Sequence, residues 1–127
     1  MIIADSDVLI DFLRGREPGM SRVRSELSTG RLATTAVNAF ELLSGAQAKS
    51  DLSKVSRLLS ALTILPLDQP ASAIAAEIRR QLEKKGEGIG MADYLIAGVC
   101  LAHQAVLLTR NQEHFTRIPD LRIDGRD

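Results

Sequence analysis

Four side chains with oxygen donors occupy positions where a metal-dependent enzyme would need them: Asp5, Glu41, Asp93 and Asn111. Asp5 follows the apolar run IIA, and Asn111 comes shortly after the apolar run AVLL. Glu41 and Asp93 lie within the first turn or so of two expected helices. Ligands of open parallel sheets collect at the carboxyl ends of the strands, so this placement favours one shared site. Carboxylate and amide oxygens are the ligands that Mg²⁺ and Mn²⁺ prefer.

Each of these side chains also has a purely structural interpretation. Asp5 is placed to cap the helix that follows it. Glu41 forms an N-x-x-E pattern with Asn38, which is the spacing of a capping box. Asp93 would complement the dipole of its helix, and Asn111 is a common turn residue. For each residue taken alone, this interpretation stays open.

The combination favours a metal site over four separate structural roles. Glu41 has large apolar neighbours in the segment FELL, and Asp93 lies in the apolar run MADYLIA, where an unsatisfied charge is costly. Carboxylates that are brought together repel and raise one another's pKa, and a divalent cation between them removes that penalty. We therefore predict that Asp5, Glu41 and Asp93 bind one Mg²⁺, which Mn²⁺ can replace.

Arginines near these positions are candidates for contacts with phosphate. The chain has 16 Lys and Arg and 16 Asp and Glu, so three metal-bound carboxylates would leave a surplus of positive charge elsewhere. Arg14 and Arg16 near the N-terminal helices, and Arg110 beside Asn111, are the candidates, and each is equally compatible with an ordinary solvated surface. The balanced total charge excludes a protein that binds nucleic acid by gross positive charge, so any anionic partner must be bound locally.

Other site chemistries lack the required spacing. His103 and His114 with the single Cys100 do not have the spacing of a zinc site, and His103 is interpreted as a residue at the edge of the core. The glycines of GEGIG follow no strand, so they indicate a turn instead of a dinucleotide-binding loop. The chain has no G-x-S-x-G motif of a serine hydrolase.

Short apolar runs alternate along the chain with segments of helical periodicity. We expect strands at 1–4, 32–35, 63–67, 105–109 and 121–123. We expect two helices that end at Gly15 and Gly30, and further helices over 38–48, 52–62, 71–82 and 91–103. Because parallel strands need crossover connections, this order predicts an α/β fold with a mostly parallel central sheet flanked by helices.

Length and composition predict one domain over residues 1–127. The single cysteine, Cys100, lies in an apolar stretch that we interpret as core, and it cannot form an internal disulfide, which favours a reducing compartment. The N-terminus lacks the pattern of a leader, and the longest apolar run is about half a membrane span. We therefore expect a cytoplasmic protein without a membrane segment.

At these residues the chain resembles the PIN-domain ribonucleases, and among them the VapC-like toxins of toxin–antitoxin pairs. The segment IIADSDVLIDFLRG is similar to the family's opening strand, with Asp5 as metal ligand and Ser6 as the small hydroxyl residue that follows it. The segment TTAVNAFELLSGA resembles the second motif and contains Glu41. The segment GIGMADYLIAGVCLAHQAVLLTRNQEHFTRIPDLRI resembles the third and fourth motifs, with Asp93 and with Thr109 and Asn111 in its TRNQEHF stretch.

The resemblance implies a three-layer PIN-like fold and a Mg²⁺-dependent endoribonuclease that hydrolyses RNA with a metal-activated water. It also implies a VapB-like antitoxin as partner and a homodimer. Many PIN domains carry Asp where this chain has Asn111, so less charge is available for a second metal. Asp7 adds a carboxylate where the family often has Asn, and it either supports the site or favours the helix dipole.

Two other functions are compatible with parts of the sequence. Asp5 and Asp7 have the spacing of the nucleophile and general acid of HAD-like phosphotransferases, but that chemistry also needs a downstream Lys and an acidic pair, where this chain has Arg110 and Asn111. Alternatively, the neutral Asn111 is the sign of a catalytically weakened PIN-like module that binds RNA or protein.

Overall fold

A five-stranded parallel sheet forms the centre of the computed structural model, which describes residues 1–124. Its spatial order is β3-β2-β1-β4-β5, and every neighbouring pair is parallel. The strands are β1 (Ile2–Ala4), β2 (Leu32–Thr35), β3 (Thr63–Leu65), β4 (Val106–Leu108) and β5 (Arg122–Ile123). The five predicted strands and the α/β fold class are confirmed.

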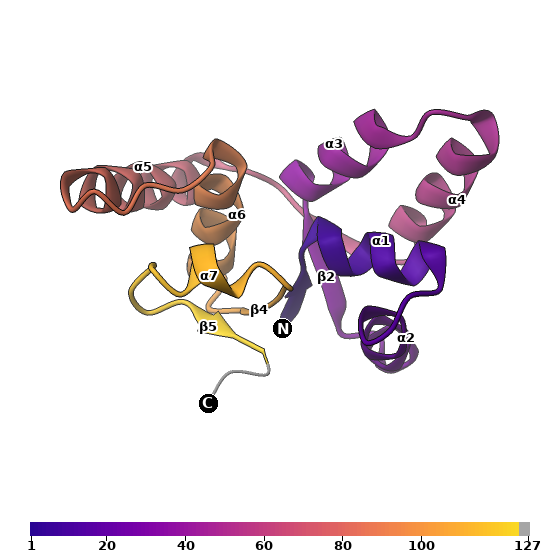
Figure 1. Ribbon diagram of the computed structural model, residues 1–127. Coiled ribbons are helices and arrows are strands. Elements are labelled where there is room, and N and C mark those ends of the chain that lie inside the picture. The colour runs from indigo at the N-terminus through magenta and orange to yellow at the C-terminus, as the bar shows by residue number, and fades with distance from the viewer. Residues whose placement is uncertain (125–127) are drawn as a thin grey trace.

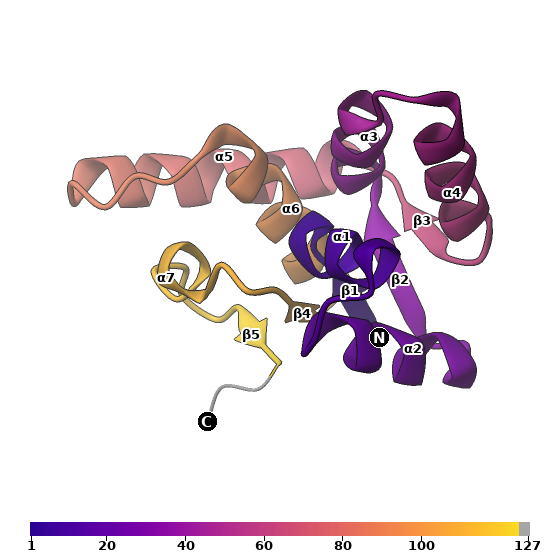
Figure 2. The same cartoon turned by 45° about the vertical axis from the view of Figure 1, so that its right-hand side comes forward.

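Helices make the crossovers that a parallel sheet needs. They are α1 (Ser6–Arg14), α2 (Gly19–Thr29), α3 (Ala36–Gly45), α4 (Lys49–Ser60), α5 (Gln69–Lys84), α6 (Met91–Ala102) and α7 (Gln112–Phe115). Helices α1 to α4 lie on one side of the sheet and α5 to α7 on the other, which gives three layers (Figures 1 and 2). The short helix α7 is absent from the sequence prediction because one turn has no measurable periodicity. Within residues 1–124, no helix has the length and apolarity needed to cross a membrane.

The alternation of side chains along each strand builds a separate core on each face of the sheet. Ile3 and Leu107 pack into the core under α5, α6 and α7, whereas Ala4 and Leu108 pack into the core under α1 to α4. Cys100 is buried in the first of these cores, as expected. Because β1 and β4 lie in the middle of the sheet and are covered on both faces, their sequence runs are continuously apolar.

Two sequence interpretations of side-chain environment are wrong. His103 is exposed at the end of α6 and does not lie at the edge of the core. Of the large apolar neighbours of Glu41, only Leu42 is a core residue, because Phe40 is 69% exposed and Leu43 is 41% exposed. Both errors have the same cause, because an apolar segment of sequence does not show which of its residues face the sheet and which face the solvent.

Helix α6 approaches α5 so closely at Gly98 that no side chain larger than the hydrogen of glycine fits there. A Cβ on Gly98 would lie 2.4 Å from the backbone oxygen of Ala71 and 2.9 Å from the Cβ of Ala75. The backbone oxygen cannot move without moving α5 itself. Gly98 is therefore required by packing and not by an unusual backbone conformation.

We predict that Gly98→Ala destabilises the protein by about 1–3 kcal/mol, because the added methyl group forces α5 and α6 apart. Urea denaturation of both proteins measures this difference. Gly45→Ala is the matched control, because Gly45 also lies in a helix and its added Cβ would meet no atom within 4 Å. Equal stability of Gly98→Ala and wild type would contradict the close packing.

Candidate active site

The carboxyl ends of β1, β2 and β4 bring together the polar residues that follow these strands. Ala4 pairs with Leu108 in the sheet register, and the backbone N–H of Asp5 donates to the oxygen of Leu108 at 2.9 Å. Thr109 therefore lies beside Asp5. On the other side of β1, the hydroxyl of Thr34 donates to the oxygen of Ala4 at 2.7 Å.

Asp5 is the most enclosed carboxylate of this group, with 7% of its surface exposed. Its Oδ1 accepts from the backbone N–H of Ser6 at 2.8 Å and from Nδ2 of Asn38 at 3.0 Å. Its Oδ2 accepts from the hydroxyl of Thr109 at 2.7 Å. Asp5 is the N-cap of α1, as its structural interpretation expected, and it is also held by groups from two other elements.

Glu41 is joined to Asp5 through Ser6 and Asn38. The hydroxyl of Ser6 donates to Oε1 of Glu41 at 2.8 Å and accepts from Nδ2 of Asn38 at 3.0 Å. Asn38 is fully buried, and its Oδ1 accepts from the hydroxyl of Thr35 at 2.7 Å. Both amide hydrogens of Asn38 are thus directed at the site.

The capping-box interpretation of Glu41 is wrong. Helix α3 begins at Ala36 with Thr35 as its N-cap, and Asn38 is the N3 partner of Thr35 in the capping box. Glu41 therefore lies a further three residues along the helix, where it has no role in capping. The helix begins earlier than the sequence pattern indicated because Thr35, the last residue of β2, already supplies the cap.

Asp7 lies next to Asp5 and has one unpartnered oxygen. Its Oδ2 accepts from the backbone N–H of Arg110 at 3.1 Å, and the hydroxyl of Thr109 lies 3.3 Å away. That hydroxyl has one proton, and its shorter contact is to Asp5. Oδ1 of Asp7 is buried with no hydrogen-bond partner among residues 1–124.

Burial, together with the neighbouring negative charge around Asp5, changes the pKa of two of these carboxyl groups. Burial, and then the charge of Asp7, raise the pKa of Asp5 from 3.8 to about 6, and Glu41 adds to the rise. The hydrogen bonds from Thr109 and Ser6 act in the opposite direction. Burial also raises the pKa of Asp7, against the opposing effect of Arg110.

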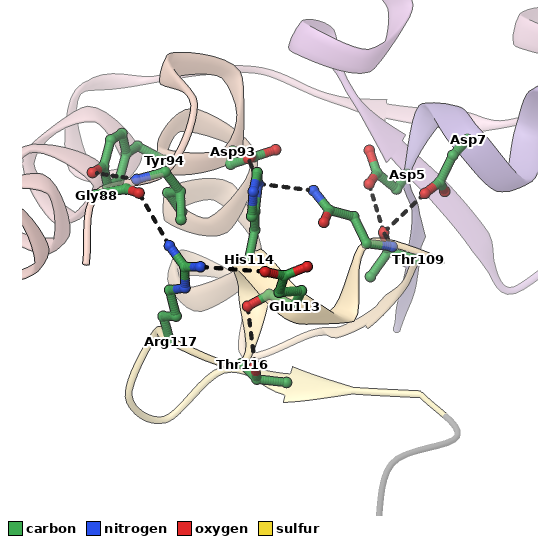
Figure 3. A network of polar contacts seen from close by, with 12 residues as sticks. Asp5, Asp7, Gly88, Asp93, Tyr94, Thr109, Glu113, His114, Thr116 and Arg117 are labelled. Atoms are coloured by element: carbon green, nitrogen blue, oxygen red, sulfur yellow. Dashed lines mark hydrogen bonds and ion pairs between the residues drawn. The ribbon is translucent and has the colours of Figure 1, made fainter.

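Asp93 belongs to a second polar cluster, which is linked to the first through Asn111. Oδ2 of Asp93, in the first turn of α6, lies 2.9 Å from Nδ1 of His114 on α7. The same Nδ1 lies 3.1 Å from Nδ2 of Asn111. The backbone N–H of Asn111 donates to the hydroxyl of Thr109 at 3.0 Å. Asp93 and Asp5 stand on opposite sides of this network (Figure 3).

The donor set has the chemistry of a divalent-cation site, although its carboxylates are not drawn together around one point. The buried Asp5, the half-buried Glu41 and the unpartnered oxygen of Asp7 are hard anionic ligands with mutual repulsion to relieve. Among residues 1–124, however, no three His, Cys, Asp or Glu side chains converge closely enough to hold an ion. The residues fit a divalent metal in type and charge. Of the three predicted ligands, Asp93 is the one that lies in the separate cluster with His114.

The arginine candidates differ in their partners. Nε and Nη2 of Arg110 contact the two carboxylate oxygens of the buried Asp11 at 2.7 and 3.3 Å, so this guanidinium fastens the end of β4 to α1. Arg14 and Arg16 line a pocket of about 420 Å³ that also contains Glu41. Within the described residues, neither of them forms an ion pair.

Comparison with known proteins assigns the family. Residues 2–121 match the PIN domain. The chain is 32% identical to ribonuclease VapC19 of Mycobacterium tuberculosis over 124 residues, which cover 96% of this chain and 98% of that protein. The chain belongs to the VapC family of PIN-domain ribonucleases. It is also 32% identical over 112 residues, 85% of each chain, to the tRNA(fMet)-specific endonuclease VapC of Salmonella typhimurium.

Solved structures of the VapC family agree with this assignment. The fold superimposes with a TM-score of 0.88 on a chain of VapBC2 from Rickettsia felis bound to promoter DNA, at 27% identity and with complete coverage of both chains. PIN-domain nucleases are typically metal-dependent. The predicted family is confirmed, and the HAD-like phosphotransferase hypothesis has no support from these matches.

The sequence does not indicate the site contacts of two residues, Asn38 and His114. Asn38 was interpreted as the start of a helix, and its contact with Asp5 spans 33 positions of sequence. His114 was considered only as a zinc ligand, and its contact with Asp93 spans 21 positions. The one local signal was the spacing of Asn111 and His114, three residues apart in a segment that became helical.

We predict that, without divalent metal, the Asp5 carboxyl makes the protein less stable as pH rises from about 4 to about 6. Its pKa is higher in the folded than in the unfolded chain, so the folded state binds more protons in this window and stability falls as they are lost. A rise from 3.8 to about 6 corresponds to ~3 kcal/mol at most. Urea denaturation in EDTA at several pH values measures the slope.

Asp5→Asn should reduce that slope to the part that comes from the raised pKa of Asp7. The variant should keep the fold, because the Thr109 hydroxyl can accept a hydrogen bond from the new amide and donate its proton to Asp7. Glu87→Gln is the control, since Glu87 is exposed in the loop between α5 and α6 and makes no side-chain hydrogen bond with the site residues among residues 1–124, and it should retain the wild-type slope. An Asp5→Asn variant with the same pH dependence as wild type would show that this carboxyl carries no such penalty.

Proposed function

We propose that this chain is a Mg²⁺-dependent endoribonuclease, the toxin of a toxin–antitoxin pair, with its site at the carboxyl ends of β1, β2 and β4. The observation that carries the proposal is the Asp5 carboxylate, whose pKa is raised to about 6 by burial and then by the neighbouring charges of Asp7 and Glu41. Such crowding is costly in the free protein and is relieved by a divalent cation. Mn²⁺ has the same ligand preference and should substitute.

In this proposal Asp5, Glu41 and Asp93 hold the metal, and Asn111 adds a neutral amide beside Asp93. The chemistry that a bound Mg²⁺ supplies is a lowered pKa for water and positive charge at the scissile phosphodiester. Hydrolysis then leaves a 5′-phosphate and a 3′-hydroxyl, and no side-chain nucleophile is required.

The neighbouring polar groups keep the carboxylates in place. Ser6 and Asn38 hold Asp5 and Glu41 by hydrogen bonds, and Thr109 holds the second oxygen of Asp5. Asp7 adds negative charge and leaves one oxygen unpartnered among the described residues. Ser6, Asp7 and Thr109 therefore support the site in this proposal.

RNA would approach along the pocket that leads to Glu41. Arg14 and Arg16 lie on its lining and carry the positive charge that a phosphate backbone needs. Arg110 is a weaker candidate for this role, because Asp11 already occupies its guanidinium. The remaining candidates are thus on α1 and the turn after it.

The antitoxin partner is proposed from the similarity of this chain to solved toxin–antitoxin complexes. Similar solved structures include DNA-bound VapBC from Salmonella typhimurium, at 30% identity and a TM-score of 0.87. We propose a VapB-like antitoxin as the partner of this chain and a homodimer as its own assembly. The alternative, a catalytically weakened module that binds RNA or protein, is favoured by the neutral Asn111 and by the dispersed carboxylates.

We predict that wild-type protein freed of antitoxin cleaves RNA in Mg²⁺ or Mn²⁺ and is inactive in EDTA. The RNA panel begins with tRNA(fMet), the substrate class in the name of the Salmonella relative. Asp5→Asn should lower the cleavage rate by about 10²-fold or more, because it removes a proposed ligand. Glu87→Gln should cleave as wild type does.

Metal binding gives a second measurement that does not depend on finding the right RNA. Mn²⁺ at about 100 times its dissociation constant should stabilise the wild type by about 2.7 kcal/mol and should stabilise Asp5→Asn much less. Thermal melting with and without Mn²⁺ shows the difference. Mn²⁺ binding without cleavage of any RNA in the panel, or no Mn²⁺ binding at all, supports the binding-module alternative.

We predict that the free protein binds one divalent ion well and that Asn111→Asp tightens Mn²⁺ binding several-fold, because it adds a full negative charge beside the cluster of Asp93. Calorimetric titration gives affinity and stoichiometry. Gln112→Glu adds the same charge one position away and should change the affinity less. Two equally tight ions in the wild type, or unchanged affinity in Asn111→Asp, would place Asn111 outside the site.

A further inference from the structure

We infer that His114 is a positioning residue that sets the orientation of the Asp93 carboxylate toward the site. This inference rests on the proposed function, in which Asp93 is a metal ligand. Nδ1 of His114 lies 2.9 Å from Oδ2 of Asp93, and it is the only side-chain hydrogen-bond partner of Asp93 among residues 1–124. Without His114, no side-chain hydrogen bond in that range would hold this carboxylate.

The hydrogen-bond chemistry of the cluster selects the proton arrangement. Nδ1 lies near both Asp93 and Nδ2 of Asn111, and a single ring nitrogen cannot donate to one and accept from the other at the same time. A carboxylate is the stronger acceptor, so Nδ1 carries the proton and donates to Asp93. The Asn111 amide then turns its oxygen toward Nδ1–H, because the two ends of an amide are interchangeable in shape.

This arrangement divides the two oxygens of Asp93 between different tasks. Oδ2 is taken by His114, and Oδ1 accepts no hydrogen bond within the described residues, so Oδ1 is the atom left for a cation. Histidines and other donors that hold a ligating carboxylate in this way commonly change metal affinity when they are removed.

The rest of α7 is held by other residues, which separates positioning from folding. Phe115 is fully buried in the core next to His114. Arg117 donates to the backbone oxygen of Gly88, on the loop before α6 (Figure 3). His114 itself is 39% exposed and is not part of either hydrophobic core cluster of the described residues.

The test compares two amides that reproduce different nitrogens of the ring. In His114→Asn the amide nitrogen takes the place of Nδ1, and in His114→Gln the amide nitrogen takes the place of Nε2. Because the contact is made by Nδ1, His114→Asn should stay within a few-fold of wild type. His114→Gln and His114→Ala should weaken Mn²⁺ binding to the free protein by about 10–100-fold, measured by calorimetry.

Kinetics and stability complete the experiment. His114→Gln and His114→Ala should lower kcat and leave KM for RNA within a few-fold, while all three variants melt as wild type does in EDTA. If Gln and Asn behave alike, or if all three variants bind Mn²⁺ as tightly as wild type, the inference is overturned and the proposed function stands. If the wild type itself neither binds Mn²⁺ nor cleaves RNA, the proposed function fails and the inference fails with it.

Discussion

One buried carboxylate constrains the centre of this protein. Asp5 follows β1, caps the N-terminus of α1 and is almost removed from water, so its charge must be met by donors that the fold supplies. Those donors come from α1, α3 and the residue after β4, and each of them requires its own element to be in register. Hydrogen bonds from three separate parts of the chain therefore meet at the Asp5 carboxyl group. Its burial favours the protonated form.

The parallel sheet makes this convergence possible. Every strand points in the same direction, so the residues that follow β1, β2 and β4 emerge at one edge. The two cores beneath α1 to α4 and beneath α5 to α7 hold the edge from both sides. The site consequently has one cluster from the first layer, around Asp5 and Glu41, and another from the second, around Asp93 and His114.

Thr109 and Asn111 connect these layers. The hydroxyl of Thr109 contacts Asp5 and accepts from the backbone of Asn111, whose side chain contacts His114. The intervening Arg110 binds the buried Asp11, so the segment after β4 is fastened to α1 as well. A change of position in this short segment would thus alter both carboxylate clusters together, which gives it a larger influence than its length suggests.

The sequence by itself determined the order along the chain of the five strands and of helices α1 to α6, the candidate site carboxylates and the resemblance to PIN ribonucleases, because apolar periodicity and short motifs are local properties of the chain. Tertiary structure alone decided that Asn38 faces Asp5 and that His114 faces Asp93, since those contacts join residues 33 and 21 positions apart. It also decided that Phe40 is exposed and that Arg110 is bound by Asp11. In each of these cases the residue type was compatible with several neighbours, and only the packing of the elements selected one.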